Sequence, residues 1–173
     1  MSPAIYNRIV FQSGAGYFST MFRGSIILTL LCWLLTATAD AAPPQVMKVL
    51  PHFLDTNGVH TLTPSLYDRD AYQAYLRLHP EKRTGIRFDV HWRNRMGVFG
   101  KLKLRVELRG IAEANLPRRL VLEQNVEPSG RFGRWTSLIL DGEEYRQFGE
   151  VTAWRVTLWE DEELLSEQKS FLW

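Results

Sequence analysis

The sequence contains a single cysteine, Cys32, and it lies in a stretch that we expect to be removed from the mature protein. The mature chain would then have no intramolecular disulfide and no thiol nucleophile. Small secreted domains of eukaryotes commonly depend on disulfides, whereas a chain of about 130 residues can bury a core large enough to fold without them. Export without disulfides therefore favours a bacterial protein.

Motifs for metal binding and catalysis are also missing. None of the four histidines pairs at the spacing of a zinc site, and the sequence has no HExxH, CxxC or DxDxDG pattern. No GxSxG elbow and no phosphate-binding glycine loop occurs in the mature region. The sequence therefore predicts no catalytic residue, no metal site and no cofactor. The histidines are His52, His60, His79 and His91.

Neither sign of charge dominates, since 21 lysines and arginines oppose 19 aspartates and glutamates, for a formal net charge of +2. Nucleic-acid binding requires basic residues concentrated in a patch, so we expect no nucleic-acid partner. Two acidic stretches, Asp68–Asp70 and Glu160–Glu163, contain carboxylate pairs of the kind that glycosidases use. Because one lies in a predicted loop and the other at a predicted hairpin tip, we interpret both as solvated turns.

The N-terminal region has the composition of a targeting segment. Arg23 precedes the apolar run Ile26–Leu35, and small residues follow that run. A transmembrane helix needs roughly 20 apolar residues, so a cleaved signal peptide over residues 21–41 is favoured over an uncleaved membrane anchor. We therefore expect a secreted or periplasmic protein with no stable membrane insertion after cleavage.

Two boundaries follow from this segment. Cleavage after Ala41 fits the small-x-small rule and cleavage after Ala39 is the alternative. Met21 stands where a signal peptide should begin, so we interpret residues 1–20 as a mis-assigned N-terminal extension. Residues 42–173 then form a single domain, because the chain is 45% hydrophobic and 23% charged, as ordinary globular domains are.

The clearest strand pattern lies in residues 151–173. Two β-rich runs flank the acidic connection Glu160–Glu163, which predicts a hairpin. In the first run apolar residues alternate with others, so the two sets lie on opposite faces of a strand. The inward set is Trp154, Val156 and Leu158, and the outward set is Arg155, Thr157 and Trp159.

Four more strands are predicted in the middle of the chain. Alternation is strong in residues 86–92 and 101–109. The residues predicted to point inward are Ile86, Phe88, Val90 and Trp92 in the first strand and Leu102, Leu104, Val106 and Leu108 in the second. Weaker strands are expected over residues 118–127 and 134–140. The segment Glu143–Gly149 is predicted to be a compact turn before the final hairpin.

The early part of the domain is less regular. Residues 45–54 predict a first strand, which Pro51 confines to a sheet edge or a bulge. Asp55–Gly58 predicts a turn, and Thr61–Pro64 a short second strand. A helix of two turns is expected over Ala71–Leu78, capped by Asp70 and stopped by Pro80, with Tyr72, Tyr75, Leu76 and Leu78 near one stripe.

Short strands separated by turns predict an all-β fold, a two-sheet antiparallel β-sandwich of about seven strands with one short helix between the early strands. The region Ile86–Trp173 resembles an immunoglobulin-like or fibronectin type III-like domain at the level of the fold. Trp92 or Trp154 would be its central aromatic residue, and Tyr145 precedes the penultimate strand, as the tyrosine corner does. The resemblance implies that the strand at 101–109 neighbours the strand at 151–160.

That pairing would create a cationic outer face with one large aromatic side chain. One explanation is solubility, since long basic side chains keep a sheet face hydrated and oppose edge pairing. The alternative is a binding face, on which the tryptophan anchors an envelope protein or an anionic glycan while the basic residues meet anionic groups. The candidate residues are Lys103, Arg105, Arg109, Arg155 and Trp159.

We therefore predict a non-catalytic extracytoplasmic binding or adaptor module of a bacterial cell envelope. A small secreted hydrolase or an enzyme inhibitor, acting through loops such as Asn94–Gly100, is one alternative. A purely structural envelope protein is another.

Overall fold

The fold seen in the computed structural model lies within Ala41–Trp173. The described residues are 44–94, 100–128 and 133–173. The predicted N-terminal extension (1–20) and signal peptide (21–41) lie outside them, as do residues 95–99 of the loop Asn94–Gly100. Across the described ranges, no helix has both the length and the apolar character needed to cross a membrane.

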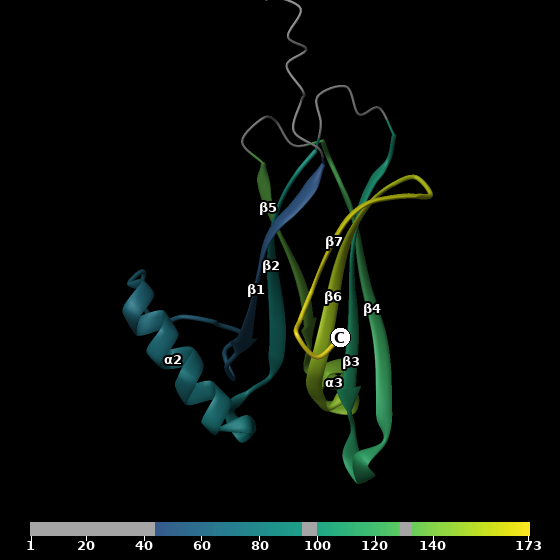
Figure 1. The fold of residues 1–173 in the computed structure, drawn as a ribbon. Coiled ribbons are helices and arrows are strands. Elements are labelled where there is room, and N and C mark those ends of the chain that lie inside the picture. Colours follow the sequence, from purple (N-terminus) through teal and green to yellow (C-terminus); the bar gives the residue numbers. More distant parts are fainter. Residues whose placement is uncertain (1–43, 95–99, 129–132) are drawn as a thin grey trace, which may run out of the picture. The chain divides into compact units, whose positions relative to one another are not determined.

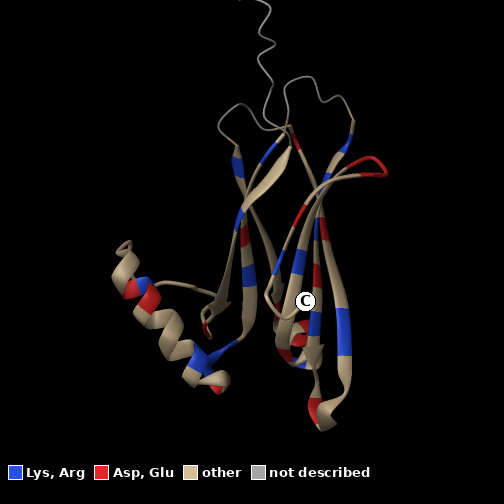
Figure 2. Ribbon diagram, viewed as in Figure 1, with Lys and Arg blue, Asp and Glu red and all other residues tan. Residues whose placement is uncertain are grey.

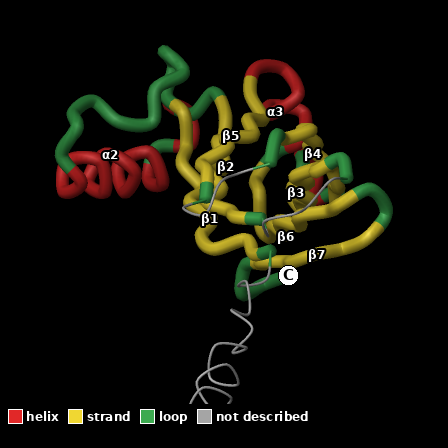
Figure 3. The backbone as a smooth tube through the Cα atoms, turned by 90° about the horizontal axis from the view of Figure 1, so that it is seen from above, coloured by secondary structure: helices red, strands yellow, loops and turns green. Residues whose placement is uncertain are grey.

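Seven strands of the described chain form two antiparallel sheets that pack face to face (Figures 1 and 3). The first sheet has the order β1-β2-β5 and the second β4-β3-β6-β7. The predicted two-sheet sandwich is confirmed. Its strands are β1 (Gln45–Leu54), β2 (Gly85–Arg93), β3 (Leu102–Ile111), β4 (Pro117–Val126), β5 (Arg134–Asp141), β6 (Glu150–Glu160) and β7 (Glu163–Lys169).

Alternating apolar residues of both sheets form the core, as their period of two requires. The predicted inward positions of β2 and β3 are all buried, and Trp92 is the largest fully buried side chain. Its indole nitrogen, Nε1, donates a hydrogen bond to Thr136 Oγ1 on β5 at 2.9 Å. The buried indole N–H of Trp92 therefore has its hydrogen bond satisfied inside the core.

The C-terminal hairpin is confirmed as β6 and β7. Val156 and Leu158 are fully buried. Trp154 lies on the same face but is only half-buried, with its ring edge-on to Phe88 at a centroid distance of 6.3 Å. The predicted face of Trp154 is therefore right, whereas the central aromatic residue of the core is Trp92.

β1 lies at the edge of its sheet, as Pro51 predicted. The helix α2 (Leu66–Leu78) runs beside this edge, on the side away from the second sheet (Figure 3). The buried amide of Gln73 accepts from the Phe53 N–H at 2.8 Å and donates to the Phe53 carbonyl at 2.9 Å. A side chain thus closes part of the strand edge, and Ser166 of β7 accepts a hydrogen bond from the Val46 N–H at 3.0 Å near its other end.

The helix differs from its prediction in start and in face. It begins after Ser65, whose hydroxyl accepts from the Asp68 N–H, so Asp70 is not the cap. The buried residues are Gln73 and Leu76, while Tyr75 and Leu78 are exposed. The predicted face was wrong because the helix packs against a strand edge. The unpaired backbone groups of that edge require a polar side chain, which Gln73 provides.

Two further segments correct the predictions. Residues Thr61–Pro64 form no strand and belong to an irregular loop. The predicted turn Glu143–Gly149 is instead a second helix, α3 (Gly142–Phe148), which carries the half-buried Tyr145 against the core. Gly149 ends this helix at φ 83°, where a Cβ would clash with the Ile111 carbonyl oxygen.

Candidate functional site

The predicted pairing of the two central strands is confirmed. β3 and β6 are antiparallel neighbours, with Arg105 opposite Thr157 and Glu107 opposite Arg155. On the other side of β3, β4 adds Glu123 to the same outer face, opposite Arg105. Figure 2 shows basic and acidic segments side by side on these strands.

Acidic residues neutralise part of this face. The Arg105 Nε atom lies 3.1 Å from a carboxylate oxygen of Glu123, and the Lys103 ammonium lies 3.6 Å from the same side chain. Arg155 donates to Glu107 at 2.8 Å. All of these groups are partly exposed, so each pair contributes only about 0 to 1 kcal/mol to stability.

Beyond these ion pairs the face contains a pocket of about 330 Å³. Four arginines and one glutamate line it, beside the ring of a tryptophan. Positive charge therefore exceeds negative charge around the opening, whereas the chain as a whole is nearly neutral. The charged and aromatic lining residues are Arg105, Glu107, Arg109, Arg119, Arg155 and Trp173.

Trp173 organises the arginines of the pocket. The guanidinium carbon of Arg109 lies 4.0 Å from the centre of the indole ring, and that of Arg155 lies 5.1 Å from it. Such cation–π contacts contribute about 0.5 to 2 kcal/mol each, depending on exposure. The Nε atoms of both arginines are buried and have no hydrogen-bond partner within the described part of the chain. These two Nε donors are therefore unsatisfied among the described residues and shielded from solvent.

The five predicted site residues separate into two groups. Arg105, Arg109 and Arg155 line the pocket. Lys103 and Trp159 are directly opposite each other farther along the same strands and do not line it. Trp159 is half-buried, and its indole N–H donates to Thr157 Oγ1 at 2.8 Å. Trp159 is therefore neither a core residue nor a fully open anchor.

Arg119 and Trp173 line the pocket but were absent from the prediction. Arg119 alternates with the inward residues of its strand, so the sequence did indicate that its side chain points outward. Nothing in the sequence placed that strand beside the strand at 101–109. Trp173 reaches the pocket because the segment after β7 folds onto β6, where Ser170 bonds the backbone of Trp154 at 3.0 Å. That return is a tertiary feature with no local sequence signal.

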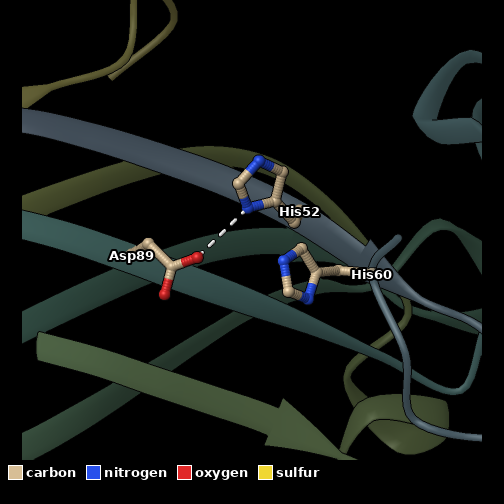
Figure 4. A group of neighbouring side chains, drawn as sticks. All are labelled: His52, His60 and Asp89. Carbon is tan, nitrogen blue, oxygen red and sulfur yellow. Dashed lines mark hydrogen bonds and ion pairs between the residues drawn. The ribbon is translucent and has the colours of Figure 1, made fainter. Parts of the chain in front are cut away.

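A second cluster of chemically reactive side chains lies on the outer face of the β1-β2-β5 sheet. It joins His52 of β1, Asp89 of β2 and His60 of the loop before α2 (Figure 4). Their nitrogen and carboxylate oxygen atoms lie within 4.8 Å of one another, and His52 Nδ1 is 3.3 Å from Asp89 Oδ2. The sequence spacing of the histidines did not indicate this cluster, because a turn and a strand pairing create it.

The environment sets the charge of two members of this cluster. Burial raises the pKa of Asp89, but hydrogen bonds from His52, Ser137 and Arg87 outweigh it and hold that pKa far below its usual range. Burial lowers the pKa of His60, and the nearby charge of Arg87 lowers it further. At neutral pH the cluster therefore contains one carboxylate and, at His60, a neutral imidazole.

Comparison with known proteins assigns neither site, because no protein-family model, no curated protein and no solved structure matches this chain.

Proposed function

We propose that this protein is a non-catalytic extracytoplasmic binding module of a bacterial cell envelope, and that the pocket beside Trp173 holds an anionic group of its partner. The observation that supports this most is the convergence of four arginines and one glutamate on a pocket of about 330 Å³. An anion in the pocket would meet the positive charge of the guanidinium groups and accept hydrogen bonds from them.

The residue types match anion recognition. Arginine presents planar donors that fit a carboxylate, a phosphate or a sulfate, and its hydrogen bonds to charged oxygens are stronger than neutral ones. The side chains of Arg109 and Arg119 form no ion pair with any described residue, so their charges remain available. The solubility explanation accounts for exposed basic side chains but not for the convergence of four arginines on one pocket.

The volume of the pocket favours a small ligand group. Ligand sites in proteins have volumes of roughly 300 to 1,000 Å³, and this pocket lies at the lower end of that range. A single acidic sugar residue suits such a pocket better than a broad protein interface does. We therefore favour an acidic envelope glycan as the partner. An acidic segment of an envelope protein is the other candidate.

The extracytoplasmic location rests on the predicted signal peptide, residues 21–41, and remains a proposal. The immunoglobulin-like resemblance is also a proposal. In its favour, the strand order β4-β3-β6-β7 brings β3 beside β6, which is the pairing that the resemblance implied.

Isothermal titration calorimetry with an acidic oligosaccharide, its neutral counterpart and an acidic peptide tests the proposal. We expect the acidic oligosaccharide to bind and the neutral one not to bind. Arg109→Gln and Arg119→Gln should each weaken binding about tenfold, the loss of one charge-assisted contact of about 1.4 kcal/mol. Arg134→Gln is the matched control, because Arg134 is an exposed arginine of the other sheet.

Added salt should weaken binding, since the contacts are partly exposed and therefore screened. Stronger binding of the acidic peptide would transfer the partner assignment to an envelope protein. Equal binding of the acidic and neutral oligosaccharides, or equal losses in all three variants, would contradict an anion pocket. Trp159→Ala examines the other end of the face, and a loss of binding there would show that the partner extends beyond the pocket.

A further inference from the structure

We propose that His52, His60 and Asp89 bind a divalent ion of a late first-row transition metal, with Zn²⁺ as the reference ion. The site lies on the β1-β2-β5 sheet and shares no residue with the arginine pocket. It is therefore a second binding function, independent of the proposed anion binding.

The donor atoms are close to the geometry that zinc requires. With bonds of about 2.0 to 2.1 Å, neighbouring ligands of a tetrahedral zinc ion lie about 3.3 Å apart. His52 Nδ1 and Asp89 Oδ2 are already 3.3 Å apart. The remaining distances are at most 4.8 Å, so the His60 imidazole has to move inward by about 1.5 Å or less. Figure 4 shows one ring nitrogen of each histidine turned toward the carboxylate.

One buried amide fixes the backbone on both sides of the site. Gln73 bonds the N–H and carbonyl of Phe53, the residue after His52. Its Nε2 atom also donates to the carbonyl oxygen of His60 at 2.8 Å. The backbones of the two histidines are thus held relative to each other, so the site closes when the His60 side chain rotates and the ion displaces the proton between His52 and Asp89.

The carboxylate is oriented in the way that metal ligands commonly are. Asp89 Oδ1 accepts hydrogen bonds from Arg87 Nε at 2.7 Å and from the Ser137 hydroxyl. These bonds occupy one oxygen and leave Oδ2 directed at His52. Supporting hydrogen bonds of this kind fix ligand orientation, and their loss typically weakens metal binding 10- to 100-fold.

The types of donor atom select the class of ion. Arg87 is bonded to Asp89, and both Arg87 and Arg69 act on His60 as positive charges, so the ion must be held by its ligand bonds and not by the net charge of the site. Ca²⁺ and Mg²⁺ require several oxygen ligands, and the cluster offers only one carboxylate. Imidazole nitrogens instead suit Zn²⁺, Cu²⁺ and Ni²⁺. Three protein ligands leave a fourth position for water or a further ligand.

Titration of the protein with Zn²⁺ alone, followed by calorimetry and by competition with a chromophoric chelator, tests the site. We expect one ion per chain, and no binding of Ca²⁺ under the same conditions. His60→Asn should weaken zinc binding at least tenfold, because it removes a ligand without touching the bond between His52 and Asp89. His79→Asn removes an exposed histidine outside the cluster and should change nothing.

A second variant separates ligation from folding. His60→Cys supplies a thiolate, so it should restore much of the affinity that His60→Asn loses, whereas a merely structural role of His60 predicts no rescue. Melting temperatures of the metal-free variants establish that each is folded. Absence of stoichiometric zinc binding in the wild type, undiminished binding by His60→Asn, or equal affinity for Ca²⁺ would overturn the proposal.

Discussion

The hydrogen bond between Trp92 and Thr136 gives the most direct test of the core. Trp92 has no exposed surface, and its indole N–H has Thr136 Oγ1 as its partner at 2.9 Å. Thr136→Val keeps the shape of the side chain but leaves this donor buried without an acceptor. An unsatisfied buried polar group costs about 1 to 3 kcal/mol. That is a large part of a typical free energy of unfolding of about 5 to 15 kcal/mol.

Trp92→Phe removes the donor itself and therefore permits a double-mutant cycle. In the Trp92→Phe background, Thr136→Val should lower the free energy of unfolding by less than about 0.5 kcal/mol, because no indole N–H remains that could be left without an acceptor. Urea unfolding followed by circular dichroism measures each free energy. With a denaturant slope of about 2 kcal/mol/M, the single mutation Thr136→Val should lower the midpoint by about 0.5 to 1.5 M.

Additive losses of unfolding free energy for Trp92→Phe and Thr136→Val would contradict a coupling between the two side chains. If Thr136→Val were equally destabilising in the presence and in the absence of the indole, the hydrogen bond would not be the source of the loss. A Thr136→Val protein as stable as the wild type would likewise show that the indole N–H does not depend on Thr136.

Three further predictions concern other parts of the chain. Trp154→Ala should lower the free energy of unfolding by about 2 to 3 kcal/mol, because Trp154 is only half-buried. Truncation of a fully buried aromatic residue typically costs roughly 3 to 5 kcal/mol. Urea unfolding should therefore show a larger loss of stability for Trp92→Ala than for Trp154→Ala. Burial raises the pKa of Asp55, but hydrogen bonds from the Val59 N–H, the Tyr72 hydroxyl and the Asn57 N–H outweigh it and hold that pKa below its usual value. Its contribution is therefore present above about pH 4 and lost as the pH falls further, so thermal melts should show a smaller acid-induced loss in Asp55→Asn than in the wild type. Mass spectrometry of the exported protein should find a mature N-terminus near Ala42, and a membrane-bound species that retains residues 26–35 would show an anchor instead.

Strand alternation was enough to predict most of the sandwich, because inward residues such as Phe88 and Val106 repeat with a period of two and are buried in the structure. It also placed Arg105 and Arg155 on one face once the neighbouring strands were assumed. The buried face of the helix α2 was harder to predict. This face contains Gln73, whose role depends on the open edge of β1 and not on any apolar stripe.

The sites were less predictable than the fold, since both arise from contacts between distant segments. Trp173 meets Arg109 only after the last residues fold back over β6. His60 meets His52 only because the turn at Asp55 returns the chain along β1. Local sequence patterns describe strands and turns, whereas these juxtapositions depend on how the strands and turns are assembled.

A crystal structure of the protein with the acidic oligosaccharide that binds it most tightly tests the central claim. We predict density for the anionic group in the pocket beside Trp173, with its oxygen atoms within hydrogen-bond distance of the guanidinium groups of Arg109 and Arg155. Density for the ligand at another surface, with the Arg109 and Arg155 side chains making no contact to it, would contradict the proposed function.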